Sequence, residues 1–176
     1  MKKTVKLILV LATLCTLSGC YSKPESAFSF HLAQTRVTGL EQNLTEEELP
    51  LSEMACKVDS RHFMSSNELL DVDGASVGLA NGESLLGFYF TTTDLGKNRL
   101  LSATAENQGA FIILKESRGK ELNKIIGARQ IDAAIHNGKI FIIPEMEFES
   151  DEEFDELIES WKESIRRHRA IRDAPI

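Results

Sequence analysis

An apolar run near the start of the sequence closes on a cysteine, and this decides which part of the chain has to fold. The run covers residues 7–17, and the residues on either side of it are Lys2, Lys3, Lys6, Ser18, Gly19 and Cys20. A basic start followed by an apolar segment too short for a lasting membrane span is the build of a cleaved secretory signal. We therefore expect residues 1–19 to be removed and the folded protein to begin at Cys20.

The end of this run resembles the bacterial lipoprotein signal. Leu17 stands at −3, Ser18 and Gly19 are the small residues at −2 and −1, and Cys20 is the cysteine at +1. The resemblance implies that the Cys20 thiol carries a diacylglyceryl group and its amine a further acyl chain. Each buried methylene contributes about 0.8 kcal/mol, so two or three chains hold a protein to a membrane. The alternative is an ordinary secretory signal followed by a chance cysteine.

The lipoprotein resemblance also gives an expected location. We expect a cell-envelope protein anchored by lipid, with no other membrane attachment. In a host with an outer membrane, Tyr21 stands where inner-membrane lipoproteins typically have aspartate, which implies the outer membrane, with the domain facing the periplasm.

Length predicts one domain. Removing residues 1–19 from the 176 leaves 157 residues, enough for a single core and few for two. Residues 20–26 are polar apart from Cys20, Tyr21 and Pro24 and have little to bury, which indicates a short tether. The expected domain covers residues 27–169, and residues 170–176 form a tail.

Charge and cysteine content exclude further classes. The chain has 20 basic and 27 acidic residues, and three of the lysines leave with the signal, so the mature chain is strongly acidic. A nucleic-acid surface is not expected. Cys15 also leaves and Cys20 is lipidated, so Cys56 has no partner for an internal disulfide, and it is interpreted as a small buried residue rather than a reactive thiol.

The first half of the chain carries weak structural signals. Alternation of apolar residues predicts a strand over residues 27–34. The acidic segment 35–53 is expected to be mainly loop, and residues 56–58 to form a short strand. Residues 65–70 are expected to form one helical turn. The sequence Asp71-Val72-Asp73-Gly74 is similar to the start of a calcium loop, but its glycine comes too early and the distal glutamate is missing, so it is interpreted as a turn.

The second half is better defined. Apolar runs on both sides of Asn81-Gly82 predict a hairpin over residues 75–91. Asp94 is a candidate cap for a helix to about Asn107, ended by Gly109 in the left-handed conformation. Further strands are expected over residues 110–114, 124–131 and 139–143, with residues 116–120 as a turn.

The last helix has the strongest local signal. Ser150 and Glu153 have the spacing of a capping box, in which the serine accepts an amide hydrogen bond and the glutamate reaches back to the cap. Acidic residues come early and basic residues late, as the helix dipole favours. The apolar residues fall on one face and are expected to dock on the sheet: Phe154, Leu157, Ile158, Trp161 and Ile165.

Residues 77–168 together resemble the head subdomain of the first periplasmic region of SecD, a membrane subunit that assists bacterial protein export. In that family a helix ends in T-x-E-N-x-G before a strand of the type A-I-V-L, as residues 104–109 and 110–114 do here. The following apolar and glycine positions are matched by Gly127, Ile131, Ile135 and Gly138. Arg129 departs from the usual proline, and the transmembrane helices of SecD are absent.

The resemblance implies a fold and no more. It implies an α+β protein built as a two-layer sandwich, with an antiparallel or mixed sheet and two principal helices on one face. A proton-driven translocation activity does not carry over, because the membrane part is missing.

No pattern in the sequence indicates catalysis, a metal or a cofactor. Histidines 31, 62, 136 and 168 lack ligand spacing and are interpreted as surface residues, and neither a nucleophile elbow nor a phosphate loop is present. Glu145, Glu147 and Glu149 alternate, so on an extended segment they would share one face; they are interpreted as solvated carboxylates, with weak cation binding as the alternative.

Two hypotheses about function follow. The first is a lipid-anchored, non-catalytic module that binds an envelope protein or an unfolded chain, through its sheet edge or residues 35–74, with a possible relation to protein export. The second is an envelope hydrolase whose site the sequence does not reveal.

Overall fold

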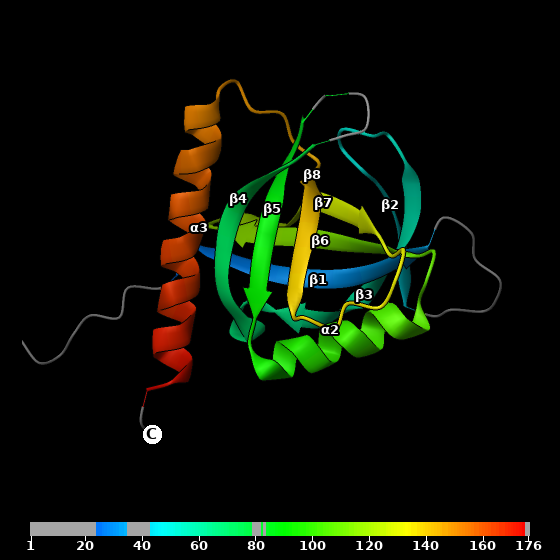
Figure 1. The fold of residues 1–176 in the computed structure, drawn as a ribbon, viewed down its shortest axis with the longest axis horizontal. Helices are drawn as coiled ribbons and strands as arrows, with labels where there is room; N and C mark the ends of the chain where they lie inside the picture. Colours follow the sequence, from blue (N-terminus) through cyan, green and yellow to red (C-terminus); the bar gives the residue numbers. More distant parts are fainter. Residues whose placement is uncertain (1–23, 35–42, 79–81, 83, 175–176) are drawn as a thin grey trace, which may run out of the picture.

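A computed structural model of the chain describes residues 24–34, 43–78, 82 and 84–174. The proposed signal, Cys20 and Asn81 of the predicted hairpin turn lie outside these residues. In chain order the elements are β1 (Ser26–Gln34), β2 (Leu44–Glu48), β3 (Ala55–Ser65), the 3-10 turn η1 (Ser66–Glu68), β4 (Leu69–Gly78), β5 (Ser84–Thr92), α2 (Asp94–Glu106), β6 (Phe111–Arg118), β7 (Glu121–Gln130), β8 (Lys139–Pro144) and α3 (Asp151–Arg172) (Figure 1).

The strands form one eight-stranded sheet in the order β2-β3-β1-β6-β7-β8-β5-β4. Every pairing among the described strands is antiparallel. The predicted hairpin is confirmed by β4 and β5, which pair from Leu69 with Thr92 to Gly78 with Ser84. The α+β class and antiparallel sheet predicted from the sequence resemblance are therefore present, in a larger sheet than expected.

The sheet bends sharply between β7 and β8, so that β4, β5 and β8 run across β1, β6 and β7 (Figure 1). Only two residue pairs join β7 to β8, and one of them is Gly127 with Pro144. A Cβ atom at Gly127 would lie 2.5 Å from Ile142 Cγ2 and 2.9 Å from the Ile143 carbonyl oxygen. Glycine is thus required where the two halves of the sheet approach each other.

The bend brings aromatic residues of distant strands into contact. Phe30 of β1 and Phe90 of β5 have ring centroids 5.4 Å apart at an angle of 89°. Trp161 of α3 packs at 4.7 Å from the Phe88 ring and is fully buried. Because the halves of the sheet pack on each other, the simple sandwich layering that we expected is not confirmed.

The helices complete this aromatic core. In Figure 1, α3 stands beside β4 and α2 lies across the lower ends of the strands. The apolar stripe predicted for the last helix is confirmed, since Phe154, Ile158, Trp161 and Ile165 are buried and Leu157 packs against them. None of the described helices combines the length and the apolar character needed to cross a bilayer.

The helix ends differ from the prediction in detail. Ser150 caps α3 by accepting a hydrogen bond from the Glu153 amide at 3.2 Å, but the Glu153 carboxylate accepts from the Glu149 amide rather than from Ser150. The cap of α2 is Thr93, whose hydroxyl accepts from the Gly96 amide, because Asp94 is already the first helical residue. Gly109 follows α2 with φ at 84°, as predicted.

Two segments predicted as irregular are edge strands. Residues 44–48 form β2, whereas mainly loop was expected, and Asp71-Val72-Asp73-Gly74 lies within β4, whereas a turn was expected. Both predictions were wrong because β2 and β4 are the two edge strands of the sheet. Charged residues are tolerated at such edges and protect them from pairing with another chain. The strand predicted over residues 56–58 is also longer, covering Ala55–Ser65.

Candidate functional site: the groove between α3 and β4

A groove runs between the edge strand β4 and helix α3. Its volume is about 670 Å³, and it is lined by Asp73, Gly74, Ala75, Ser76, Leu86, Asp151, Phe154, Asp155, Ile158, Glu159 and Lys162. The four β4 residues are consecutive, so the groove follows the edge of the strand rather than one of its faces. The helix residues recur every three or four positions and therefore lie on one side of α3.

The inner wall of the groove is apolar. Phe154 and Ile158 are almost fully buried, whereas Leu86 of β5 keeps 39% of its surface exposed. A Cβ atom at Gly74 would lie 2.6 Å from Phe154 Cε1, so glycine lets the phenyl ring lie directly against the strand. The apolar wall thus comes up to the backbone of β4.

The rim of the groove is acidic. Asp73, Asp151, Asp155 and Glu159 line it, and Lys162 is the basic residue among the lining side chains. The Lys162 ammonium lies 3.1 Å from Asp73 and 3.1 Å from Glu159. Hydrogen bonds to Glu159 and then to Asp73 raise the pKa of Lys162, so it stays protonated and already paired. Two carboxylates, those of Asp151 and Asp155, remain to receive a cation.

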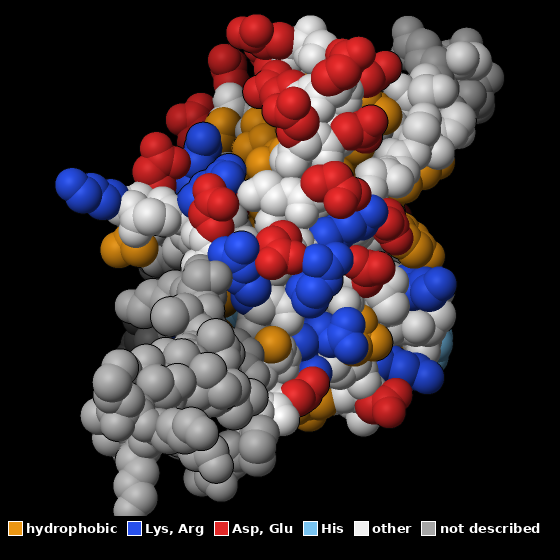
Figure 2. All heavy atoms as spheres, turned by 90° about the vertical axis from the view of Figure 1, so that its left-hand side faces the viewer, with side chains coloured by type: hydrophobic (Ala, Val, Ile, Leu, Met, Phe, Trp, Pro, Cys, Tyr) orange, Lys and Arg blue, Asp and Glu red, His pale blue; other side chains and the backbone are white. Residues whose placement is uncertain are grey.

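The surface around α3 shows the same distribution. Figure 2, which views the molecule from the side of α3, shows acidic side chains gathered around an apolar patch in the upper part, where α3 begins. Lysine and arginine side chains gather in the middle and lower part of the same face, with acidic side chains among them.

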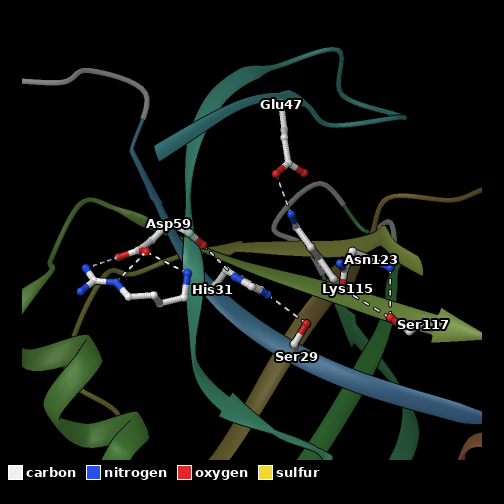
Figure 3. Close-up of polar contacts among 8 residues, drawn as sticks. Ser29, His31, Glu47, Asp59, Lys115, Ser117 and Asn123 are labelled. Atoms are coloured by element: carbon white, nitrogen blue, oxygen red, sulfur yellow. Dashed lines mark hydrogen bonds and ion pairs between the residues drawn. The ribbon is translucent and has the colours of Figure 1, made fainter. Parts of the chain in front are cut away.

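A polar cluster on the face of β1 that points away from the aromatic core is a second candidate site (Figure 3). The His31 ring is buried, with Nδ1 2.8 Å from the Asp59 carbonyl oxygen and Nε2 2.9 Å from the Ser29 hydroxyl. A carbonyl oxygen only accepts, so Nδ1 carries the hydrogen and Nε2 of the neutral ring accepts from Ser29. The prediction of a surface histidine was wrong at this position.

The Ser29 and His31 pair has the relation of a nucleophile to its base, but its surroundings do not make a catalytic site. Ser29 lies in a strand that is paired on both sides, opposite Ser65 of β3 and Lys115 of β6. Its backbone is therefore inside the sheet and is not available to bind a substrate. Three smaller hollows of about 300, 410 and 480 Å³ also occur on the molecule, and neither residue lines these or the main groove.

Charges around His31 are paired. Lys115 donates to Glu47 of β2 at 2.6 Å, and Arg61 lies 3.0 Å from the Asp59 carboxylate. The hydrogen bonds from Arg61 hold the pKa of Asp59 below its usual range. Burial lowers the pKa of His31, and the nearby Lys115 and His62 act in the same direction, against the Asp59 carbonyl and Glu47.

The alternating glutamates do not share one environment. Glu145 is buried and its Oε2 accepts from the amides of Leu51 and Ser52, each at 3.0 Å, while Oε1 accepts from the Ser52 hydroxyl. The interpretation of Glu145 as solvated was therefore wrong, whereas Glu147 and Glu149 are exposed. Within the described part of the chain, no three His, Cys, Asp or Glu side chains are grouped so as to hold a metal ion.

Cys56 lies in a small apolar cluster under β2, together with Leu49, Val58 and Ile113. It is buried, as predicted, and its thiol is free. Burial, and then the charge of Glu47, raise the pKa of the Cys56 thiol, which keeps it protonated and unreactive.

The fold and the site thus define an α+β domain with an acidic groove at the edge of its sheet. The chain matches no protein-family model and no curated protein sequence. It does match solved structures of SecDF, the protein whose periplasmic region the sequence resembles. One, from work on SecDF as a membrane component that enhances protein export, has 13% identity and a TM-score of 0.45, covering 82% of this chain and 63% of that one.

A second solved structure, of SecDF in its super-membrane-facing form, has 16% identity and a TM-score of 0.46, with 82% of this chain and 19% of that chain covered. The chain thus spans less than two thirds of either SecDF chain. Likeness of this degree says nothing about what this chain binds, which has to be argued from its own residues.

Neither the groove nor the polar cluster was predicted from the sequence. One sequence pattern could have indicated the groove, because Asp151, Asp155 and Glu159 recur at helical spacing beside the apolar stripe. A second pattern could have indicated the polar cluster, since the alternation of Phe28 and Phe30 puts Ser29 and His31 together on the opposite face of the strand.

Proposed function

We propose that the mature protein is a lipid-anchored, non-catalytic module of the cell envelope that binds an extended polypeptide segment in the groove between α3 and β4. The observation that carries this proposal is the groove itself, which joins an unpaired strand edge to an apolar wall and an acidic rim. These are the three features that recognise a peptide in strand conformation.

The strand edge supplies hydrogen bonds. β4 pairs with β5 on one side and ends the sheet on the other, so alternate backbone N–H and C=O groups point away from β5. Helix α3 packs against the rest of this edge, so an added strand would satisfy the groups of residues 73–76 that line the groove. Hydrogen bonds to the backbone do not depend on the sequence of the peptide. Such a site suits a chain that has not yet folded and still has free backbone groups.

The walls supply selectivity. Alternate side chains of a bound strand would point toward Phe154, Ile158 and Leu86, and apolar residues fit there. Side chains at the rim would meet Asp151 and Asp155, which favour lysine or arginine. The preferred segment therefore combines apolar and basic residues.

A lipid on Cys20 would hold this groove close to a membrane. We expect Cys20→Ala to leave the membrane fraction or to stall as the uncleaved precursor. Cys15→Ala is the matched control, since it removes the other cysteine of the signal region and leaves the lipidation position intact. Equal processing and fractionation of both variants and the wild type would remove the lipid anchor from the proposal.

The groove is tested by the binding of a fluorescent peptide of about ten residues. Threonine occupies every second position of the peptide, and valine and lysine occupy the positions between. The mature protein, kept in detergent micelles, should bind it. Glutamate in place of lysine should weaken binding because of the acidic rim. Methyl groups on alternate backbone nitrogens should abolish it, because they remove the hydrogen bonds of an added strand.

Variants of the protein locate the site. Asp155→Lys should weaken binding of the lysine peptide by about threefold to tenfold. Glu152→Lys makes the same charge change on the same turn of α3, outside the groove, and should bind as the wild type does. If both variants weaken binding equally, the peptide is held by the general charge of the helix, and the groove is not its site.

The non-catalytic part of the proposal has its own test at the Ser29 and His31 pair. We expect the protein to leave ester, peptide and glycan substrates unchanged, with or without divalent metals. Turnover that copurifies with the protein and is lost in Ser29→Ala would establish the hydrolase instead.

A further inference from the structure

We propose that the C-terminal half of α3 is a contact surface for anionic phospholipid, which lies against the membrane and turns the groove away from it. The proposal rests on the lipid anchor at Cys20 proposed above. It does not depend on what the groove binds.

The charges of α3 separate along its length. Residues 151–160 include six acidic side chains and no basic one, whereas residues 164–172 include four arginines and no acidic one: Arg166, Arg167, Arg169 and Arg172. The helix dipole favours this order. It does not account for Ile171, which keeps 48% of its surface exposed one helical turn beyond Arg167. An exposed aliphatic side chain beside an arginine is the composition of a surface that rests on lipid.

The arginines are only partly neutralised by their neighbours. Arg166 and Arg167 share Glu163, and Arg172 pairs with Asp173. Arg169 and Arg172 also donate to the backbone carbonyls of Leu70 and Asn67, at 3.3 and 2.7 Å. These carbonyls fix the guanidinium groups in position and leave their positive charge in place, so the end of the helix stays basic.

The anchor leaves the domain at this same surface. Ser26, the first residue of β1, has its carbonyl oxygen 3.0 Å from His168 Nε2 and its amide bonded to the Ser164 hydroxyl at 3.1 Å. Six peptide steps separate Ser26 from Cys20, and each spans at most about 3.6 Å, so the lipidated residue lies within roughly 20 Å of this part of α3. A membrane that receives the acyl chains is therefore within reach of the arginines.

Charge then sets the orientation. The attraction of a few arginines to an anionic membrane is too weak to anchor a protein alone but enough to orient one that is already tethered. The acidic first half of α3, with the groove beside it, is repelled by the same membrane. The groove would thus open toward the aqueous side, where a polypeptide can enter it.

The orientation can be read with a fluorophore at residue 171. The lipidated protein carrying Ile171→Cys is labelled with an environment-sensitive dye, and the buried Cys56 is protected from labelling. It is then reconstituted into vesicles of phosphatidylcholine alone, or with about a third of phosphatidylglycerol. We expect the emission to shift to shorter wavelength with phosphatidylglycerol, and the shift to be lost at high salt.

Two controls make the result specific. Leu51→Cys carries the dye on the loop after β2 at nearly the same exposure, 49%, and should show no shift. Arg166→Gln with Arg169→Gln should remove the shift at residue 171, whereas Lys57→Gln with Lys139→Gln, which removes the same charge from β3 and β8, should not. Equal emission from residue 171 in both kinds of vesicle, or a shift that survives loss of the two arginines, would overturn the proposal.

The outcome is separate from the tests of the groove and the anchor. Failure of the lysine peptide to bind leaves the emission shift unaffected. Failure of the protein to stay with the vesicles is seen directly, and it counts against the lipid anchor and this orientation together.

Discussion

The two faces of β1 are built in different ways. Toward the inside, Phe28 and Phe30 pack among the rings of Phe88, Phe90 and Trp161, in a cluster drawn from most of the sheet and both α-helices. Toward the outside, Ser29 and His31 belong to a polar region in which each group has a specific partner. Beyond them lies a small apolar cluster around Leu49, Cys56 and Val58.

The difference shows how stability is divided in this molecule. The inner region gains its free energy from burial, which is spread over many contacts and joins distant elements. The outer region holds β2 through its pairing with β3 and the small cluster around Leu49, and it adds a few polar links, chiefly Glu145 with the amides of residues 51 and 52 and Lys115 with Glu47. Damage inside should therefore unfold the whole domain, and damage outside should loosen only residues 44–54.

The largest expected effect is that of Trp161→Ala. Trp161 is fully buried, lies 5.1 Å from the Phe28 ring, and donates from Nε1 to the buried Glu116 carboxylate at 2.9 Å. Its truncation should lower the free energy of unfolding by about 3–5 kcal/mol, and the loss of the donor to Glu116 adds to this. Denaturant unfolding followed by circular dichroism measures the change.

Leu157→Ala is the control on the same helix, since Leu157 is only partly buried. It should cost clearly less. Unchanged unfolding of Trp161→Ala would mean that α3 does not close the aromatic core, and the contrast between the two faces of β1 would disappear.

A smaller and local effect is expected for Glu145→Ala. The substitution removes the acceptor from two backbone amides and one hydroxyl, at a cost of roughly 1–3 kcal/mol. Hydrogen exchange should speed up in residues 49–54 while the amides of β5 stay protected. Glu147→Ala, two residues further along and exposed, should change neither measurement. Loss of protection throughout the sheet would show that the outer region is not separable from the core.

The inner region could largely be predicted from the sequence, and the outer region could not. The cap and apolar stripe of α3, the hairpin of β4 and β5, and the first strand were all set by local spacing. The bend of the sheet was not, because it depends on the close approach of Gly127 to Ile142 and Ile143, and no local pattern marks that approach.

The errors in the outer region share one cause. Glu145 is 93 and 94 residues away from the amides that it holds, and His31 is 28 residues from the carbonyl that fixes its ring. A buried polar residue with a distant partner has the same local sequence as an exposed one. The edge strand β2 and the first part of β4, residues 71–74, were missed for a related reason, since their exposed carboxylates resemble loop sequence.

The smallest expected effect is a change in pH dependence at His31. Because burial lowers its pKa below the usual value of about 6.5, the unfolded chain takes up the proton first as pH falls. Stability from this residue is therefore fully present above about pH 6.5, decreases as pH falls below that value, and levels off once pH passes the pKa of the folded state. The slope that one such group contributes is at most about 1.4 kcal/mol per pH unit.

The difference in unfolding free energy between the wild type and His31→Gln isolates this contribution, because all other groups titrate in both proteins. This difference should stay constant above about pH 7. As pH falls from about 6.5, the wild type should lose stability relative to His31→Gln. Lys115, His62, Glu47 and the Asp59 carboxylate are the charged and titratable groups near the ring. The comparison is therefore repeated in Glu47→Gln, where loss of the attracting carboxylate should lower the pKa of His31 further and extend the slope to lower pH. A difference that does not vary with pH would show that the pKa of His31 is the same in the folded and the unfolded chain, and that burial in the outer face of β1 does not lower it.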